Sequence, residues 1–182
     1  MLDLDSTVFE RYGHQQGSLK GYNPRKHGRP SHHPLLAMLA EAKVVVHAWL
    51  RSGNTASARG VKSFLDETLA RLPAGFRLYA LRADSGFFIN DFLVYLEEHL
   101  LPYVIAVRMN PHLRRTVAGL SQSGWKPFAA GLEAAETTYQ AVGWKMPRRL
   151  VVVREELRQR PEARGRMLIE VPGIPIMCWS PP

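Results

Sequence analysis

The sequence holds a single cysteine, Cys178, among 182 residues. One thiol excludes an intrachain disulfide framework and a cysteine-rich zinc site. No apolar run approaches the ~20 residues that a membrane span requires. Asp3 and Asp5 make the first residues too acidic for a secretory signal peptide. These absences predict a cytoplasmic protein with no membrane partner.

Acidic residues are also scarce relative to basic ones. The sequence has 16 Asp and Glu against 24 Lys and Arg, a formal charge of +8. This excess favours a polyanionic partner, above all nucleic acid. Hydrophobic residues make up 46% of the chain and charged residues 22%, which excludes a disordered tail and indicates one globular domain of ordinary size.

Hydrophobic periodicity predicts an α/β layer domain with a mixed sheet in the first 110 residues. Strands are expected at residues 2–9, 35–39, 44–50, 76–83 and 103–107, with a long loop at 13–34. Thr55 or Ser57 is expected to cap a helix that runs to about residue 72, because apolar side chains recur there at helical spacing. A second helix opens at Asn90 or Asp91 and ends before Pro102.

The pattern changes after Asn110-Pro111, because long helical periodicity disappears. Short strands punctuated by glycine and proline are expected at residues 137–144, 149–154, 167–171 and 174–179. We therefore divide the chain into an α/β core at residues 1–110 and a β-rich subdomain at residues 111–182.

Two aspartates stand at strand ends in the predicted core. Asp5 lies on the polar face of the first strand, and Asp84 closes a later strand before Ser85-Gly86. Where two such strands are neighbours, their carboxylates meet at one edge of the sheet, where ligands of open α/β sheets collect. Carboxylates there are hard ligands suited to Mg²⁺ or Mn²⁺. A turn or helix-cap role for each aspartate is the alternative.

Short motifs along almost the whole chain carry a family resemblance. They are Leu2-Asp-Leu-Asp-Ser-Thr7, Tyr12-Gly-His-Gln-Gln-Gly17, Gly21-Tyr-Asn-Pro24, His33-Pro-Leu35, Leu50-Arg-Ser-Gly-Asn54, Arg82-Ala-Asp-Ser-Gly-Phe87, Tyr103-Val-Ile-Ala106, Tyr139, Gly143-Trp144 and Arg148-Arg-Leu-Val-Val-Val153. In this order the motifs resemble those of bacterial insertion-sequence DDE transposases.

The resemblance implies an RNase H-like catalytic core that carries out metal-dependent cut-and-paste DNA transposition with Mg²⁺ or Mn²⁺. The family's first aspartate corresponds to Asp5 and its second to Asp84, and both are expected to be catalytic metal ligands. Asp3 is the fallback for the first position. The family also has a β-rich insertion, which residues from about 111 onward fit.

One departure is serious, because the family's third carboxylate belongs to a Tyr-x₂-Arg-x₃-Glu motif that this sequence lacks. We therefore expect a fragment without the N-terminal region and the C-terminal glutamate helix, inactive alone and inclined to self-associate. Whether it acts as an enzyme stays open. A non-catalytic DNA-binding remnant is the alternative, and a nuclease that uses Glu97 or Glu98 is a weaker one.

Several residues are candidates for contact with DNA in the nucleoid: Arg51, Asn54, Arg82, Arg148 and Arg149. Arginine favours two-point contact with phosphate. The alternatives are helix capping by Asn54 or Thr55, pairing of Arg82 with a carboxylate, and a solvated face for the C-terminal arginines. The histidines are expected to be core or surface residues rather than metal ligands.

Overall fold

A computed structural model describes residues 1–13, 15–21, 23, 27–155 and 176–180, the last of these by their backbone alone. The chain divides into two compact units. The first comprises Met1–Ile105 with Ser180–Pro182, and the second comprises Ala106–Trp179.

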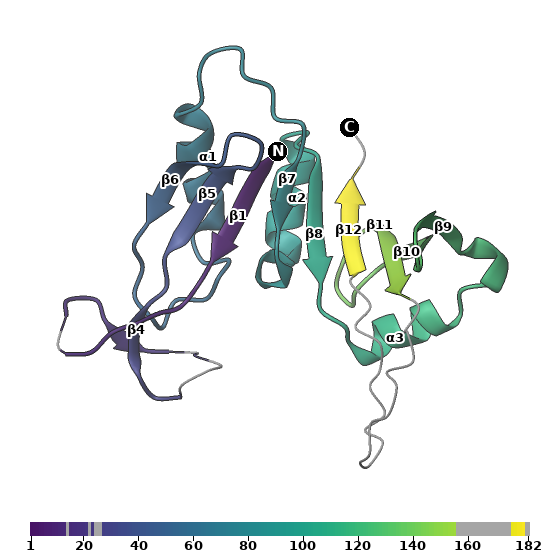
Figure 1. Cartoon of the computed structure of the whole chain (residues 1–182), viewed down its shortest axis with the longest axis horizontal. Helices are drawn as coiled ribbons and strands as arrows, with labels where there is room; N and C mark the ends of the chain where they lie inside the picture. The colour runs from purple at the N-terminus through teal and green to yellow at the C-terminus, as the bar shows by residue number, and fades with distance from the viewer. Residues whose placement is uncertain (14, 22, 24–26, 156–175, 181–182) are drawn as a thin grey trace. The chain divides into compact units, whose positions relative to one another are not determined.

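The first unit is built on a mixed sheet with the strand order β6-β5-β1-β7-β8 (Figure 1). Its strands are β1 (Leu2–Ser6), β5 (Leu35–Leu39), β6 (Val44–Trp49), β7 (Leu81–Ala83) and β8 (Tyr103–Val107). β5 pairs antiparallel with β1 and with β6, whereas β7 runs parallel to β1 and to β8. The predicted α/β fold with a mixed sheet and flanking helices is confirmed, as is the hairpin of β5 and β6.

One face of this sheet is apolar and the other polar, because leucine and aspartate alternate along β1. Leu4 is 3% exposed, and the register places it opposite Ala37, which in turn lies opposite His47. Helix α1 (Val61–Ala70) packs on this apolar face. Because successive side chains of a strand point to opposite faces, Asp3 and Asp5 lie on the face away from α1.

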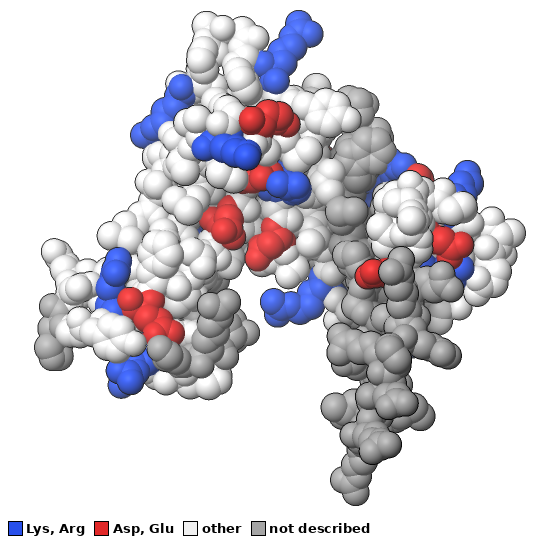
Figure 2. Space-filling model, viewed as in Figure 1, with Lys and Arg blue, Asp and Glu red and all other residues white. Residues whose placement is uncertain are grey.

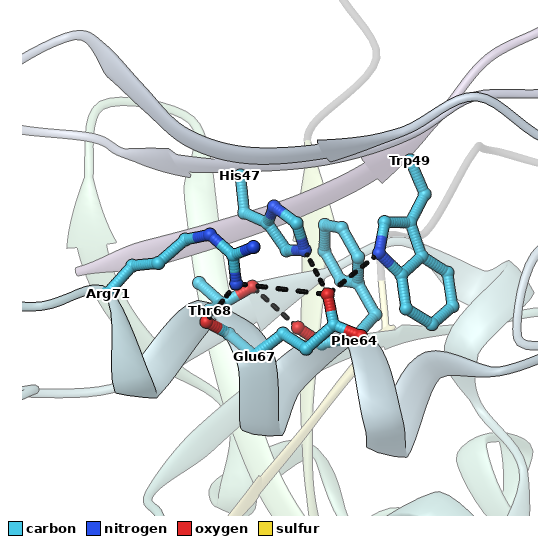
Figure 3. A network of polar contacts seen from close by, with 6 residues as sticks. All are labelled: His47, Trp49, Phe64, Glu67, Thr68 and Arg71. Atoms are coloured by element: carbon cyan, nitrogen blue, oxygen red, sulfur yellow. Dashed lines mark hydrogen bonds and ion pairs between the residues drawn. The ribbon is translucent and has the colours of Figure 1, made fainter.

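Polar and aromatic contacts join α1 to β6 (Figure 3). Glu67 Oε2 lies 2.9 Å from His47 Nε2 and accepts a hydrogen bond of 3.1 Å from Trp49 Nε1. The Phe64 ring stacks on His47 with centroids 4.7 Å apart and meets Trp49 edge-on at 5.3 Å. His47 is therefore a packed structural residue, as the sequence predicted for the histidines.

Helix α1 begins later than the sequence predicted. Gly60 occupies its N-cap position in a left-handed conformation (φ 75°) and makes no side-chain cap bond. Residues 52–59 form turns instead, with Thr55 N donating to Ser52 O and Arg59 N donating to Ala56 O. Capping of this helix by Asn54, Thr55 or Ser57 was therefore a wrong prediction, because these residues belong to the preceding turns.

The strand predicted at residues 76–83 shortens to β7. Leu81 pairs with Leu2, the first residue of β1, so residues 76–79 lie beyond the register of β1. Tyr79 there is 79% exposed. The following helix is confirmed as α2 (Asn90–Glu98), which buries Phe92, Leu93 and Leu96. A short 3₁₀ helix, η1 (Ser85–Phe87), joins β7 to α2.

The predicted long loop at residues 13–34 contains strands instead. β2 (Phe9–Glu10), β3 (Leu19–Lys20) and β4 (Pro30–His32) form a small antiparallel sheet in the order β2-β4-β3. His32 also bridges to Ser52, and Gly53 packs directly against the backbone of Leu19 and Ser31. Pairs two or three residues long carry no visible alternation, which is why the sequence pattern indicated a loop.

The second unit is antiparallel, with the strand order β12-β11-β10-β9. Its strands are β9 (Lys126–Ala129), β10 (Leu132–Tyr139), β11 (Arg148–Glu155) and β12 (Ile176–Ser180). The strand predicted at residues 137–144 ends at Tyr139 as part of β10, because a turn with Gly143 at φ 84° follows. The strand predicted at 167–171 lies outside the described residues.

The second unit also contains a helix that the sequence analysis missed, α3 (Pro111–Ala118). Asn110 Oδ1 accepts from Leu113 N at 2.8 Å, and proline occupies the first turn. Asn110-Pro111 indicates a break in the sequence pattern, but an N-cap followed by proline is also how helices start. Across the described part of the chain, no helix has the length and apolar character needed to cross a membrane.

Candidate active site

Asp5 and Asp84 lie at the same edge of the first unit's sheet. β1 and β7 are parallel neighbours, with Leu4 opposite Ala83. Asp5 and Asp84 each follow that pair by one residue, and both are exposed. Parallel strands end at one edge, so this register brings the backbones of the two aspartates together at the carboxyl ends of β1 and β7.

Each of these carboxylates is oriented by one backbone amide. Asp5 Oδ1 accepts from Ser6 N at 2.7 Å, and Asp84 Oδ1 accepts from Gly86 N at 2.9 Å. Asp84 thereby caps η1. Among the described residues, no donor contacts the second oxygen of either carboxylate. The cap role foreseen as the alternative for Asp84 is thus real, and it leaves one oxygen available to a ligand.

Asp3, the fallback for the first aspartate, is held by an arginine. Arg82 Nε donates to Asp3 Oδ1 at 2.9 Å and Arg82 Nη2 donates to Asp3 Oδ2 at 2.5 Å. The hydrogen bonds and the charge of Asp3 raise the pKa of Arg82. Both oxygens of Asp3 are therefore occupied, which separates it from Asp5. Of the two roles left open for Arg82, this ion pair is present, and phosphate contact stays a prediction.

Arg51 and Asn54, predicted to contact DNA, differ sharply in environment. Asn54 is exposed. Arg51 is half-buried, and its guanidinium donates to Ser6 Oγ and to the carbonyl oxygens of four residues: His33, Ala56, Ser57 and Arg59. Burial lowers the pKa of the Arg51 guanidinium. Contact of either residue with DNA stays a prediction.

The arginines of the second unit make contacts within that unit. Arg148 is 6% exposed, with its guanidinium carbon 4.4 Å from the Trp144 ring centroid. Arg149 forms a two-point pair with Glu136, at 2.9 and 2.6 Å. DNA contact by Arg148 and Arg149 also stays a prediction. Four further C-terminal arginines, Arg158, Arg160, Arg164 and Arg166, lie outside the described residues.

Glu97 and Glu98 are poorly placed to join the two aspartates. Glu97 Oε1 accepts from the hydroxyl of Tyr103 at 2.8 Å. Tyr103 begins β8 opposite Leu81, so this contact lies at the amino ends of the parallel strands, away from Asp84. Within the described ranges, no group of three or more His, Cys, Asp or Glu side chains is arranged to hold a metal ion.

Residues 1–166 match the family model described as transposase DDE domain group 1. The chain belongs to the transposase DDE domain family. The resemblance seen in its motifs is confirmed over most of its length.

A solved structure shares the fold of this DDE domain. The cryo-EM structure of the piggyBac transposase synaptic complex with hairpin DNA superposes on 98% of the chain with a TM-score of 0.53 at 16% sequence identity. The chain covers 32% of the length of that transposase. A search of curated proteins found no match.

Sequence reasoning missed how this DDE domain supports its two aspartates. The sequence predicts Arg51 as a contact to DNA, because it follows a strand and precedes an expected helix N-terminus. The only signal for its real position was the run Arg51-Ser-Gly-Asn54, in which Gly53 marks a close backbone approach. Nothing in the pattern indicated that Arg51 reaches back to Ser6, 45 residues earlier.

Proposed function

We propose that this DDE domain serves a transposase of an insertion sequence, with Asp5 and Asp84 as the carboxylates that hold its divalent metal. The observation that carries the proposal is the parallel pairing of β1 and β7, in which each aspartate directly follows the last pair, Leu4 and Ala83. DNA strand cleavage and strand transfer are the reactions we propose for the whole transposase.

The donor set suits Mg²⁺ or Mn²⁺. Both metals prefer carboxylate oxygens, and Asp5 and Asp84 are exposed with one oxygen each outside the hydrogen bonds described above. When bound, such an ion activates water and stabilises the leaving oxygen in phosphodiester cleavage. The chain's own contribution is to orient the carboxylates through the amides of Ser6 and Gly86.

DNA is the partner that we propose. The charge of +8 favours a polyanion. The solved structure with the same fold is a transposase complex with hairpin DNA. On the view in Figure 2, acidic side chains of the first unit lie among lysines and arginines. Association with the nucleoid would follow from DNA binding.

A Mn²⁺ titration followed by electron paramagnetic resonance tests the metal site. We expect the wild-type chain to bind Mn²⁺, and Asp5→Asn and Asp84→Asn each to weaken binding at least about 10-fold by removing a ligand. Glu41→Gln is the control, since Glu41 is an exposed carboxylate that contacts the amino group of Met1 at the other end of β1. Equal affinity in all four proteins would contradict the proposal.

DNA binding without cleavage is the second candidate. The observation in its favour is that, among the described residues, no third acidic side chain joins Asp5 and Asp84 to form a three-ligand metal site. A nicking assay with Mn²⁺ on supercoiled DNA separates the two candidates. Cleavage that disappears in Asp84→Ala supports the enzyme, whereas DNA retention without nicking supports the second candidate.

A further inference from the structure

Arg51 occupies an unusual place for a basic residue of a nucleic-acid enzyme. It follows β6 and is half-buried, and its guanidinium makes five hydrogen bonds. Among the described residues every acceptor is uncharged, namely four backbone carbonyls and one hydroxyl. An arginine with its donors directed at neutral oxygens of its own chain serves as a cross-link rather than as an ion-pair partner.

On one side this cross-link reaches the carboxyl end of β1. Arg51 Nη2 donates to Ser6 Oγ at 2.7 Å, and Ser6 Oγ in turn donates to Pro34 O at 3.2 Å. The amide of Ser6 is the group that donates to Asp5 Oδ1. Arg51 therefore holds the residue that orients the Asp5 carboxylate.

On the other side, Arg51 binds the backbone of the loop at residues 56–59. Arg51 Nη1 donates to the carbonyls of Ser57 at 3.0 Å and Arg59 at 2.8 Å. Ser57 packs against the turn that follows β7, because a Cβ added at Gly86 would lie 2.9 Å from Ser57 Cβ and Oγ. The amide of Gly86 is the group that donates to Asp84 Oδ1.

The loop at residues 56–59 thus supports both carboxylates. Arg51 links this loop to Ser6, the neighbour of Asp5, and the same arginine holds Ser57 where it packs on Gly86 in the turn after Asp84. Only a guanidinium has five N–H groups in a fixed planar fork, so lysine at this position would keep the charge but not the cross-link.

We propose that Arg51 is a positioning residue that sets the relative placement of the Asp5 and Asp84 carboxylates, rather than a contact to DNA. This inference rests on the proposed function, because the two carboxylates matter to it as metal ligands. Residues that orient metal ligands without touching the metal typically change metal affinity about 10–100-fold when mutated.

The test compares Arg51→Lys with Arg59→Ala in the whole chain. Arg59 is an exposed arginine of the same loop whose backbone carbonyl, not its side chain, accepts from Arg51. We expect Arg51→Lys to weaken Mn²⁺ binding about 10-fold while its urea midpoint shows it folded, and Arg59→Ala to bind as the wild type does. Hydrogen exchange should speed up at the amides of Ser6 and Gly86 in Arg51→Lys, with or without Mn²⁺.

Ser6→Ala is the milder variant should Arg51→Lys fail to fold. It removes only the hydroxyl that Arg51 contacts, and we expect it to weaken Mn²⁺ binding a few-fold in a folded protein. Folded variants that bind Mn²⁺ like the wild type and keep slow exchange at Ser6 and Gly86 would overturn the inference. The proposed function fails separately, if the wild type and Asp84→Asn bind Mn²⁺ alike.

Discussion

Asp3 and Arg82 lie directly opposite each other on the parallel strands β1 and β7, and their side chains form a two-point ion pair. The Asp3 side chain is 14% exposed, whereas Asp5, two residues further on the same face, is exposed. The pair joins the two strands two residues before Asp5 and Asp84. The structure therefore distinguishes two aspartates that the sequence left as alternatives.

Removing Asp3 should affect metal binding far less than removing Asp5. In Asp3→Asn we expect Mn²⁺ affinity to fall no more than about 3-fold, against at least about 10-fold for Asp5→Asn, because Arg82 already uses both oxygens of Asp3. Electron paramagnetic resonance of both variants checks the ranking. A larger loss in Asp3→Asn would return Asp3 to the first ligand position.

Gly53→Ala should disrupt the small sheet of β2, β3 and β4. A Cβ there would overlap the carbonyl oxygens of Ser31 and Leu19, which are backbone atoms of that sheet. We expect a loss of roughly 1–3 kcal/mol in the free energy of unfolding, the range for overpacked sites. Urea denaturation measures it. Gly124→Ala is the control, because a Cβ at Gly124 meets nothing within 4 Å, and an equal loss there would refute the prediction.

Glu67 should make the first unit sensitive to acid. Its hydrogen bond from Trp49 and its contact with His47 lower the pKa of Glu67 in the folded chain from its usual 4.5. A depressed carboxyl pKa stabilises the fold above about pH 4.5, and that contribution is lost as pH falls through the folded-state pKa. Urea midpoints between pH 3 and pH 6 should therefore fall less steeply on acidification in Glu67→Gln than in the wild type. Parallel curves would contradict the assignment.

Binding to DNA should weaken steeply with salt. If the domain makes about four phosphate contacts, counterion release lowers affinity roughly 100-fold between about 50 and 200 mM salt. Fluorescence anisotropy with a labelled duplex measures the slope. Asp84→Asn, which removes an acid and no base, should keep the same slope. An affinity that does not change with salt would argue against phosphate contact as the main attraction.

The positions of the main core elements follow from the sequence. In β1 the apolar residues alternate with polar ones and are the buried ones, and in α2 Phe92, Leu93 and Leu96 are buried at helical spacing. β5 and β8 are short, wholly apolar runs, which also indicates strands. Asp5 and Asp84 were also identifiable as candidates, because both stand in polar positions at strand ends within family motifs. Local patterns suffice there because burial of one face decides the conformation.

Tertiary contacts determined the rest. β2, β3 and β4 are too short for periodicity and exist through pairing with one another. Helix α1 starts late, after turns whose carbonyls at Ala56, Ser57 and Arg59 accept hydrogen bonds from Arg51, and these contacts cannot be predicted from the local sequence.

The sequence by itself determined the family, the alternation of the sheet and the two candidate carboxylates, because each is written in residues close together in the chain. Only the tertiary structure decided that Asp3 pairs with Arg82 and that Arg51 joins Ser6 to residues 56–59. Those choices depend on strand register and on hydrogen bonds between segments 45 and 79 residues apart, which no local pattern encodes.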